Sequence, residues 1–178
     1  MNILKTSLCD CVVIEPVVFD DERGFFLETF NGARYAELAN IVLPFVQDNH
    51  SRSSKNVLRG LHFQKNKPQG KLVRVVSGSV FDVAVDIRKD STTFGCWEGV
   101  VLSENNKKQF WIPPGFAHGF VVLSDFADFE YKCTDYYDPS DEGCISWCDP
   151  DLDINWPVET PILSNKDLYA SSFAELAT

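Results

Sequence analysis

Residues 80–88 read VFDVAVDIR, and this stretch is the most informative one about the fold. Successive side chains of a β-strand point to opposite faces, so Phe81 and Val83 share one face while Asp82 and Asp86 share the other. In an ordinary sandwich the acidic face lies in water, which is the more common arrangement. In a barrel with a ligand cavity, the polar face instead lines the cavity and the apolar face packs against another sheet. The alternation predicts a strand and leaves both orientations open.

Strand-like runs continue on both sides of this stretch, separated by turn signals such as Pro-Pro-Gly at residues 113–115. Pro16 indicates an edge strand, because proline lacks a ladder donor. One helix is expected at residues 33–39 and a small one from Lys166 onward. Many short strands with little helix predict an antiparallel all-β sandwich or barrel. The expected strands cover residues 12–14, 17–19, 25–30, 71–76, 80–87, 97–102, 109–112, 119–123 and 128–136.

Length and composition bound the organisation of the chain. With 178 residues, of which 44% are hydrophobic, the sequence predicts a single domain over residues 1–178 that needs no disulfide or structural metal to fold. The 16 Lys and Arg against 26 Asp and Glu give a net charge of −10, which argues against a partner that is a nucleic-acid polymer. A small anionic ligand is still compatible with this net charge, because a few arginines in one pocket can outweigh the negative potential of the protein as a whole.

The first residues and the six cysteines bear on the cellular compartment. Charges at Lys5 and Asp10 interrupt the N-terminal stretch, so it contains no apolar region as long as that of a signal peptide. No apolar run in the sequence approaches the roughly 20 residues of a membrane span. We therefore expect a cytoplasmic protein without a membrane segment, whose thiols are reduced. A four-thiolate zinc site is disfavoured because neither close cysteine pair has the usual two-residue spacing. The cysteines are Cys9, Cys11, Cys96, Cys133, Cys144 and Cys148.

His62 stands out among the three histidines, which are His50, His62 and His118. Any one of them taken alone is more simply a hydrogen-bonded structural residue. His62, however, lies on an otherwise apolar strand between the cations Arg59 and Lys71. A histidine can take a proton near neutral pH, a lysine can stabilise the resulting oxyanion, and an arginine can hold a phosphate bidentately. These residue types suit carbanion chemistry on a phosphorylated substrate.

The surroundings of His62 argue against a metal site. Metal-binding β-barrels often use a His-x-His pair and a downstream Glu, but His62 is followed by Phe63 and Gln64. His118 supplies no second clustered ligand, and metal sites need three or four. We therefore expect a site that is free of metal.

Two tyrosines extend the set of candidates. Tyr131 and Tyr137 are six positions apart, so a regular strand would place both on one face. They either fill the core or face a cavity, where a phenol can donate a proton or stack on a base. The residues alone leave this choice open.

Seven stretches occur in an order that resembles the dTDP-4-dehydrorhamnose 3,5-epimerase family, and the resemblance runs from about Asp10 to Asp167. They are DERGFF (21–26), QDNHS (47–51), LRGLHFQ (58–64), QGKLVR (69–74), FDVAVDIR (81–88), IPPGFAHGF (112–120) and the run from Tyr131 to Pro139. The resemblance implies a cupin-like double-stranded β-helix (a jelly-roll barrel) with short peripheral helices. It also implies a homodimer that exchanges an N-terminal strand, and no cofactor.

The resemblance implies a reaction as well. The family inverts C3 and C5 of dTDP-4-dehydro-6-deoxy-D-glucose, giving dTDP-4-dehydro-L-rhamnose for L-rhamnose and thus for lipopolysaccharide or O-antigen biosynthesis. By this resemblance His62 is the base, paired with Asp167, while Tyr131 is the acid on the opposite face and Lys71 holds the enolate oxygen. The implied substrate-binding residues are Arg23, Glu28, Gln47, Asp48, Asn49, Arg59, His118, Tyr137, Glu142 and Lys166.

Two other functions stay open at this point. One is an epimerase that inverts only C3 or only C5 of another dTDP-deoxysugar. The other is a sugar-binding cupin without catalysis, which would be expected to lack the His, Lys or Tyr. The presence of His62, Lys71 and Tyr131 favours the double epimerase.

Overall fold

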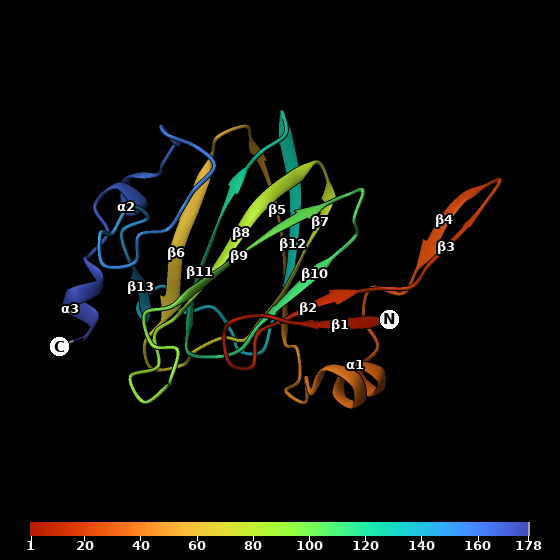
Figure 1. The fold of residues 1–178 in the computed structure, drawn as a ribbon, viewed down its shortest axis with the longest axis horizontal. Helices are drawn as coiled ribbons and strands as arrows, with labels where there is room; N and C mark the ends of the chain where they lie inside the picture. The colour runs from red at the N-terminus through yellow and green to blue at the C-terminus, as the bar shows by residue number, and fades with distance from the viewer. Residues whose placement is uncertain (178) are drawn as a thin grey trace.

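The computed structural model describes residues 1–177, and Thr178, the last residue of the predicted domain, lies outside the described residues. Within residues 1–177 the chain forms two large antiparallel sheets that face each other, together with a separate hairpin and short helices (Figure 1). One sheet contains, in spatial order, β1 (Asn2–Lys5), β2 (Val12–Glu15), β10 (Gln109–Ile112), β7 (Lys71–Ser77), β12 (Phe126–Cys133) and β5 (Gln47–Ser54). The other contains β13 (Glu142–Cys144), β6 (Leu58–Gln64), β11 (Phe116–Val122), β8 (Ser79–Asp86) and β9 (Trp97–Ser103). The hairpin pairs β3 (Val18–Asp21) with β4 (Gly24–Leu27), and the helices are α1 (Gly32–Ala39), α2 (Asn165–Leu168) and α3 (Phe173–Ala177).

The path of the chain is that of a double-stranded β-helix. From β5 onward the strands alternate between the two sheets at almost every connection, and only β8 and β9 follow each other within one sheet. This winding confirms the expected all-β, cupin-like jelly roll. The core between the sheets is apolar, and its members include Val73, Phe110 and Phe129 from one sheet and Val80, Leu102 and Phe120 from the other.

The structure decides which way the acidic face of β8 points. Asp82 and Asp86 are fully buried, so the acidic face does not lie in water as it would in an ordinary sandwich. The opposite face, with Val83 and Val85, packs against a second apolar cluster that includes Ile145 and other residues of the C-terminal segment. The acidic face of β8 therefore lies inside the barrel, because the C-terminal segment covers the other side of the sheet.

Most expected elements are confirmed, with differences at their ends. The expected helix at residues 33–39 is α1, which begins one residue earlier, and the small helix expected near Lys166 is α2. The strands expected at residues 25–30 and 128–136 end earlier, at Leu27 and Cys133. The second one stops because the chain turns at Thr134, whose side chain accepts a hydrogen bond from the Gly70 amide at 2.8 Å.

Three strands were not predicted, namely β1, β5 and the short β13, and neither was α3 in the C-terminal tail. β5 has the sequence QDNHSRSS, which lacks the apolar alternation that signals a strand. One face of β5 is directed into a polar cavity and the other is exposed, so both faces are polar. β1 is a short strand at the edge of its sheet, where most of its residues are exposed.

Helix α1 covers the outer face of the first sheet. Tyr35 is buried in a cluster with Ile14, Leu72 and Trp111, and its hydroxyl donates to Gln109 Oε1 at 2.8 Å. Asn31 caps the first turn by accepting from the Arg34 amide. The helix leaves the end of this face that carries β5 uncovered.

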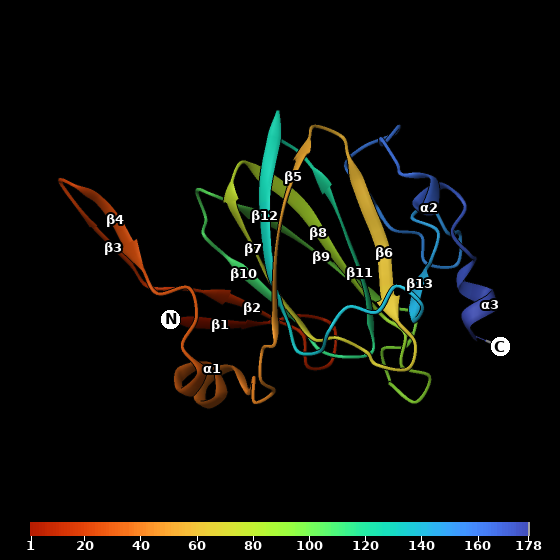
Figure 2. The same cartoon turned by 180° about the vertical axis from the view of Figure 1, so that it is seen from behind.

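The β3–β4 hairpin projects from the body as an arm (Figures 1 and 2). Three of its phenylalanines are more than half exposed: Phe19 at 62%, Phe25 at 57% and Phe26 at 68%. Arg23 lies at the turn of the hairpin and pairs with Asp21. An arm with this much exposed aromatic surface is unusual for an isolated chain.

Two findings concern the chain as a whole. Among residues 1–177, no helix has the length and apolar character needed to cross a membrane. All six cysteines are free thiols in the described chain.

Candidate active site

A cavity of about 360 Å³ opens between the two sheets. Its walls come from β5, β7 and β12 on one side and from β6, β11 and β13 on the other. Most of the predicted site residues line this cavity, although they come from distant parts of the sequence. They are Gln47, Asn49, Arg59, His62, Lys71, His118, Tyr131, Tyr137, Glu142 and Lys166.

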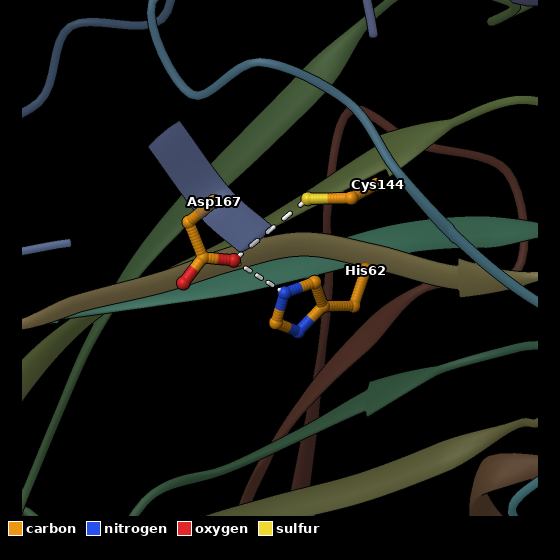
Figure 3. Close-up of side chains that lie close together, drawn as sticks. All are labelled: His62, Cys144 and Asp167. Atoms are coloured by element: carbon orange, nitrogen blue, oxygen red, sulfur yellow. Dashed lines mark hydrogen bonds and ion pairs between the residues drawn. The ribbon is translucent and has the colours of Figure 1, made fainter. Parts of the chain in front are cut away.

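The shortest polar contact at the cavity wall joins His62 and Asp167 (Figure 3). His62 Nε2 lies 2.6 Å from Asp167 Oδ1. Burial raises the pKa of the Asp167 carboxyl, but the hydrogen bonds from His62 and Ser164 outweigh it and lower this pKa to about 2. Asp167 is therefore ionised at neutral pH. Because His62 Nε2 donates to this carboxylate, Nδ1 is the nitrogen of the neutral ring that can accept a proton.

Tyr131 and Lys71 lie on the wall opposite His62. Tyr131 belongs to β12 and Lys71 to β7, whereas His62 belongs to β6 in the other sheet. Burial raises the pKa of the Tyr131 phenol, so Tyr131 stays protonated and can donate. Burial lowers the pKa of the Lys71 ammonium, and the acids Asp82 and Glu142 partly offset this effect. The cavity thus has a basic group on one wall and an acidic group on the other.

A second histidine–aspartate pair lies deeper in the barrel. His118 Nε2 is 2.9 Å and 3.1 Å from the two carboxylate oxygens of Asp82, and both residues are buried. His118 stands directly opposite His62 in the β11–β6 register. Burial lowers the pKa of His118 against the opposing effect of Asp82, and the nearby Lys71 ammonium adds to the lowering. His118 is thus held neutral at pH 7.

A chain of hydrogen bonds around Tyr137 joins several residues that line the cavity. The Tyr137 hydroxyl donates to Glu142 Oε2 at 3.0 Å, and Lys166 Nζ lies 2.8 Å from Glu142 Oε1. The Tyr137 amide donates to Gln47 Oε1 at 2.9 Å. Tyr137 comes after the end of β12 and not on the regular strand assumed from its spacing, yet its ring faces the same cavity as Tyr131.

Three predicted binding residues lie elsewhere in this chain. Arg23 is on the arm, where its side chain is 89% exposed. Glu28 pairs with Arg34 at 2.6 Å, and Asp48 pairs with Lys132 at 3.0 Å on the outer face of β5. Asp48 points outward because strand neighbours alternate, so it cannot face the cavity together with Gln47 and Asn49.

The residues around Asp167 also include the thiol of Cys144, and the three residue types are ones that can bind a metal ion. Ligand atoms of His62, Cys144 and Asp167 lie within 4.8 Å of one another. Burial and the neighbouring Asp167 raise the pKa of the Cys144 thiol to about 12, so the thiol stays protonated. Both oxygens of the Asp167 carboxylate already accept hydrogen bonds, one from His62 and the other from Ser164, so these groups satisfy one another without an ion. These groups fit a hydrogen-bonded cluster and do not fit a metal site.

Six residues that line the cavity were not predicted from the sequence, although strand alternation gave a signal for four of them. Ser51 follows Asn49 by two positions on β5, and Gln64 follows His62 by two on β6, so strand alternation places each on the cavity face. The same spacing applies to Phe120, two positions after His118 on β11, and to Phe129, two positions before Tyr131 on β12, whereas Phe63 and Gln69 carry no such signal. The missed lining residues are Ser51, Phe63, Gln64, Gln69, Phe120 and Phe129.

Comparison with known proteins gives consistent matches over nearly the whole chain. Residues 5–175 match the family described as dTDP-4-dehydrorhamnose 3,5-epimerase. The chain is 58% identical to dTDP-4-dehydrorhamnose 3,5-epimerase of Salmonella typhimurium over 172 residues, which is 96% of this chain and 94% of that protein.

Solved structures agree with these sequence matches. A dTDP-6-deoxy-D-glucose-3,5-epimerase from Legionella pneumophila, in complex with dTDP-4-keto-L-rhamnose, is 58% identical with a TM-score of 0.95, covering 98% of this chain and 96% of that one. A 3′-monoepimerase from Streptomyces bikiniensis, in complex with dTDP-quinovose, is similar at 33% identity and a TM-score of 0.89, covering 96% of this chain and 87% of that one. The similarity in sequence is thus greater to the 3,5-epimerase than to the monoepimerase.

Proposed function

The chain belongs to the dTDP-4-dehydrorhamnose 3,5-epimerase family, and on that premise we propose which of its residues carry out each step of the reaction. The protein is an isomerase of dTDP-rhamnose biosynthesis, which converts dTDP-4-dehydro-6-deoxy-D-glucose to dTDP-4-dehydro-L-rhamnose. One observation carries the assignment of residues: His62 and Tyr131 line opposite walls of the same cavity.

His62 is the base. The C4 ketone acidifies the hydrogens on C3 and C5, because the carbanion left at either carbon is delocalised into an enolate. Since His62 Nε2 donates to Asp167, Nδ1 takes the proton from carbon. The ionised Asp167 then stabilises the imidazolium that forms.

Lys71 holds the enolate oxygen. When carbon loses its proton, negative charge develops on the C4 oxygen, and a positioned ammonium stabilises it. Burial destabilises the charged form of Lys71, and the oxyanion supplies a counter-charge when it forms. The interaction is therefore stronger in the enolate than in the ketone, as a catalytic contact must be.

Tyr131 is the acid. An enolate is flat at the reacting carbon, so a proton added from the wall opposite His62 inverts the configuration. Tyr131 is on that wall, and its raised pKa keeps the phenol protonated until it donates. Because C3 and C5 both neighbour C4, the same base and acid serve both centres.

The remaining lining residues bind the nucleotide and the sugar. Arg59 Nε donates to Ser53 Oγ at 3.1 Å, and its terminal nitrogens make no other hydrogen bond within residues 1–177, so they can hold the diphosphate. Tyr137, at the mouth, stacks on the thymine. The other binding residues are Gln47, Asn49, His118, Glu142 and Lys166.

Arg23 and Glu28 act in the cavity of a second subunit of a homodimer. The arm that carries Arg23 projects away from its own barrel, and its exposed phenylalanines need a partner surface (Figure 2). Exchange of the arms between two copies would bring a second arginine to the diphosphate, because Arg59 is the one arginine among the described residues that line the cavity of a single chain. Asp48 lies on the outer face of β5 and would act at this interface.

The cellular setting follows from the thiols and the pathway. Cys9, Cys96 and Cys148 are exposed free thiols, which fits a reducing compartment such as the cytoplasm. The rhamnose unit made from the product would enter lipopolysaccharide or O-antigen.

Incubation with dTDP-4-dehydro-6-deoxy-D-glucose in deuterium oxide tests the proposal. Deuterium at both C3 and C5 of the product is the expected result. Label at only one carbon would make the protein a C3 or C5 monoepimerase. Binding without any label would leave a sugar-binding cupin, and either outcome would overturn the assignment of His62 and Tyr131 to two inversions.

A further inference from the structure

Both oxygens of the Asp167 carboxylate are held, each by a different partner. Oδ1 accepts from His62 Nε2 at 2.6 Å, and Oδ2 accepts from the Ser164 hydroxyl at 2.7 Å. We propose that Ser164 is a positioning residue for the reaction, because its hydroxyl fixes the rotation of the carboxylate that orients His62. This inference rests on the proposed role of His62 as the base.

The direction of the Ser164 hydrogen bond is set by charge. Asp167 is ionised, and a carboxylate has no proton to give, so the hydroxyl must be the donor. The same Ser164 oxygen accepts from the Asp167 backbone amide at 3.2 Å, as an N-cap residue does at the start of α2. One hydroxyl therefore holds Asp167 at both its backbone and its side chain.

The arrangement differs from the usual capping box in what the acidic side chain does. In that motif the acid three residues after the cap turns back to the cap's backbone amide. Here the Asp167 carboxylate is instead held by the cap's hydroxyl and by His62, 105 positions away. Helix α2 is only four residues long, so the cap contributes much to the placement of its single buried residue, Asp167.

Ser164 does not line the cavity within the described chain, and this predicts a specific kinetic effect. Losing the hydroxyl frees the carboxylate to rotate, which misorients the imidazole without removing any contact to substrate. We expect kcat to fall while KM stays unchanged. Since one base serves both carbons, exchange at C3 and at C5 should slow by the same factor.

Cys144 offers a weaker contact to the same carboxylate. Its Sγ lies 3.8 Å from Asp167 Oδ1, and a thiol is a weak donor. It contacts the oxygen that already faces His62, so it does not restrain Oδ2. The Gly60 backbone amide also donates to the Asp167 carboxylate, and it stays in place in any variant of Ser164. Ser164 is therefore the side chain that holds Oδ2, and its loss removes one of the restraints on the rotation of the carboxylate.

The test compares two substitutions at Ser164. Ser164→Gly removes the hydroxyl, while glycine is tolerated at an N-cap almost as well as serine. Ser164→Thr keeps both the cap and the donor, and the extra methyl has room because Ser164 is exposed. We expect the Gly variant to lose about tenfold in kcat at unchanged KM, and the Thr variant to regain most of it.

Ser172→Gly is the matched control. Ser172 Oγ accepts from the Glu175 amide at 3.4 Å at the start of the next helix, α3, and lies outside the catalytic cavity. This variant should keep the kcat of the parent protein. An equal loss of kcat in Ser172→Gly would show that loosening the C-terminal helices is enough, and would overturn the inference.

Two further results would contradict the role of Ser164. A Ser164→Gly variant with parental kcat and melting temperature would show that the hydroxyl is not needed, and failure of Ser164→Thr to restore kcat would show that the donor is not what matters. His62→Ala is run in parallel. If it keeps deuterium exchange, the proposed base is wrong; if it loses exchange while Ser164→Gly stays fully active, only the role of Ser164 is wrong.

Discussion

His62 and Asp167 are 105 positions apart in the chain, and the tertiary fold brings His62 Nε2 to 2.6 Å from Asp167 Oδ1. β6 carries the histidine and the short helix α2 carries the aspartate. The contact settles which ring nitrogen is basic, because the nitrogen that donates to the carboxylate cannot also accept a proton. It thereby links a residue near the C-terminus to the chemistry at the centre of the barrel.

His62→Ala should abolish deuterium incorporation at both C3 and C5. One base serves both carbons, so the loss should be of similar size at each and on the order of 10²–10⁴-fold. The measurement is solvent exchange followed by NMR of the sugar, with binding of dTDP as the control for an intact site. Exchange that persisted at one carbon would require a second base, for which His118 is the obvious candidate.

Tyr131→Phe should separate exchange from inversion. The variant keeps His62 and Lys71, so proton removal continues, but the opposite wall no longer has the phenol that returns a proton to carbon. We expect washout of label from the substrate with little epimerised product. Unchanged net inversion would remove Tyr131 from the role of acid.

As the pH is raised, activity should begin to fall at a pH below the ordinary pKa of a lysine side chain. Burial lowers the pKa of Lys71, so its charged form is lost earlier as the pH rises, while the raised pKa of Tyr131 keeps the phenol protonated over the same range. Lys71→Arg keeps its charge throughout and should move this alkaline limb upward, even if its rate is lower. The check is kcat/KM against pH for both proteins, and identical alkaline limbs would assign the titration to another group.

Mixing two inactive variants should restore activity if the arms are exchanged. In a hybrid dimer, one subunit carries Arg23→Ala and the other carries His62→Ala. The cavity of the Arg23→Ala subunit keeps its own His62 and receives the intact arm of its partner, so this cavity is fully native. Random mixing should recover about a quarter of the parental rate, because half of the dimers are hybrids and each hybrid has one intact site of two. If each arm served its own barrel, no hybrid would contain an intact site and the mixture would stay inactive.

The buried Asp86 should make the fold sensitive to acid. Burial raises the pKa of its carboxyl, but hydrogen bonds from Arg88, Ser91 and Thr93 outweigh this and lower it to about 2. A native pKa below the unfolded value means that this stabilisation is complete above the unfolded pKa of 3.8 and is lost as the pH falls toward 2. The lowering corresponds to about 2 kcal/mol of unfolding free energy.

Urea unfolding of the parent and of Asp86→Asn measures this contribution. The parent should lose stability between about pH 5 and about pH 2, and the difference between the two proteins should shrink over the same interval. A difference that does not change with pH would assign the stabilisation to the hydrogen bonds alone and not to the charge.

Much of the fold could be read from local patterns. The alternation in residues 80–88 identified β8, and the spacing of turn signals identified most strands of both sheets. β5 escaped because its strand has polar side chains on both faces, and apolar alternation is what reveals a strand in a sequence. The chemistry of the site was readable as well, since His62, Lys71 and Arg59 lie close together in the chain.

The sequence by itself determined the kind of protein: an all-β chain whose ordered motifs resemble one epimerase family, with candidates for a base, an acid and a cation that holds the oxyanion. Only the tertiary structure decided that the acidic face of β8 lies inside the barrel, that Asp167 with Ser164 behind it reaches His62, and that Arg23 lies far from its own cavity. Patterns along a chain report local conformation, because each depends on neighbouring residues. Which strand faces another across a barrel depends on how the sheets close, and that is settled only when the whole core packs together.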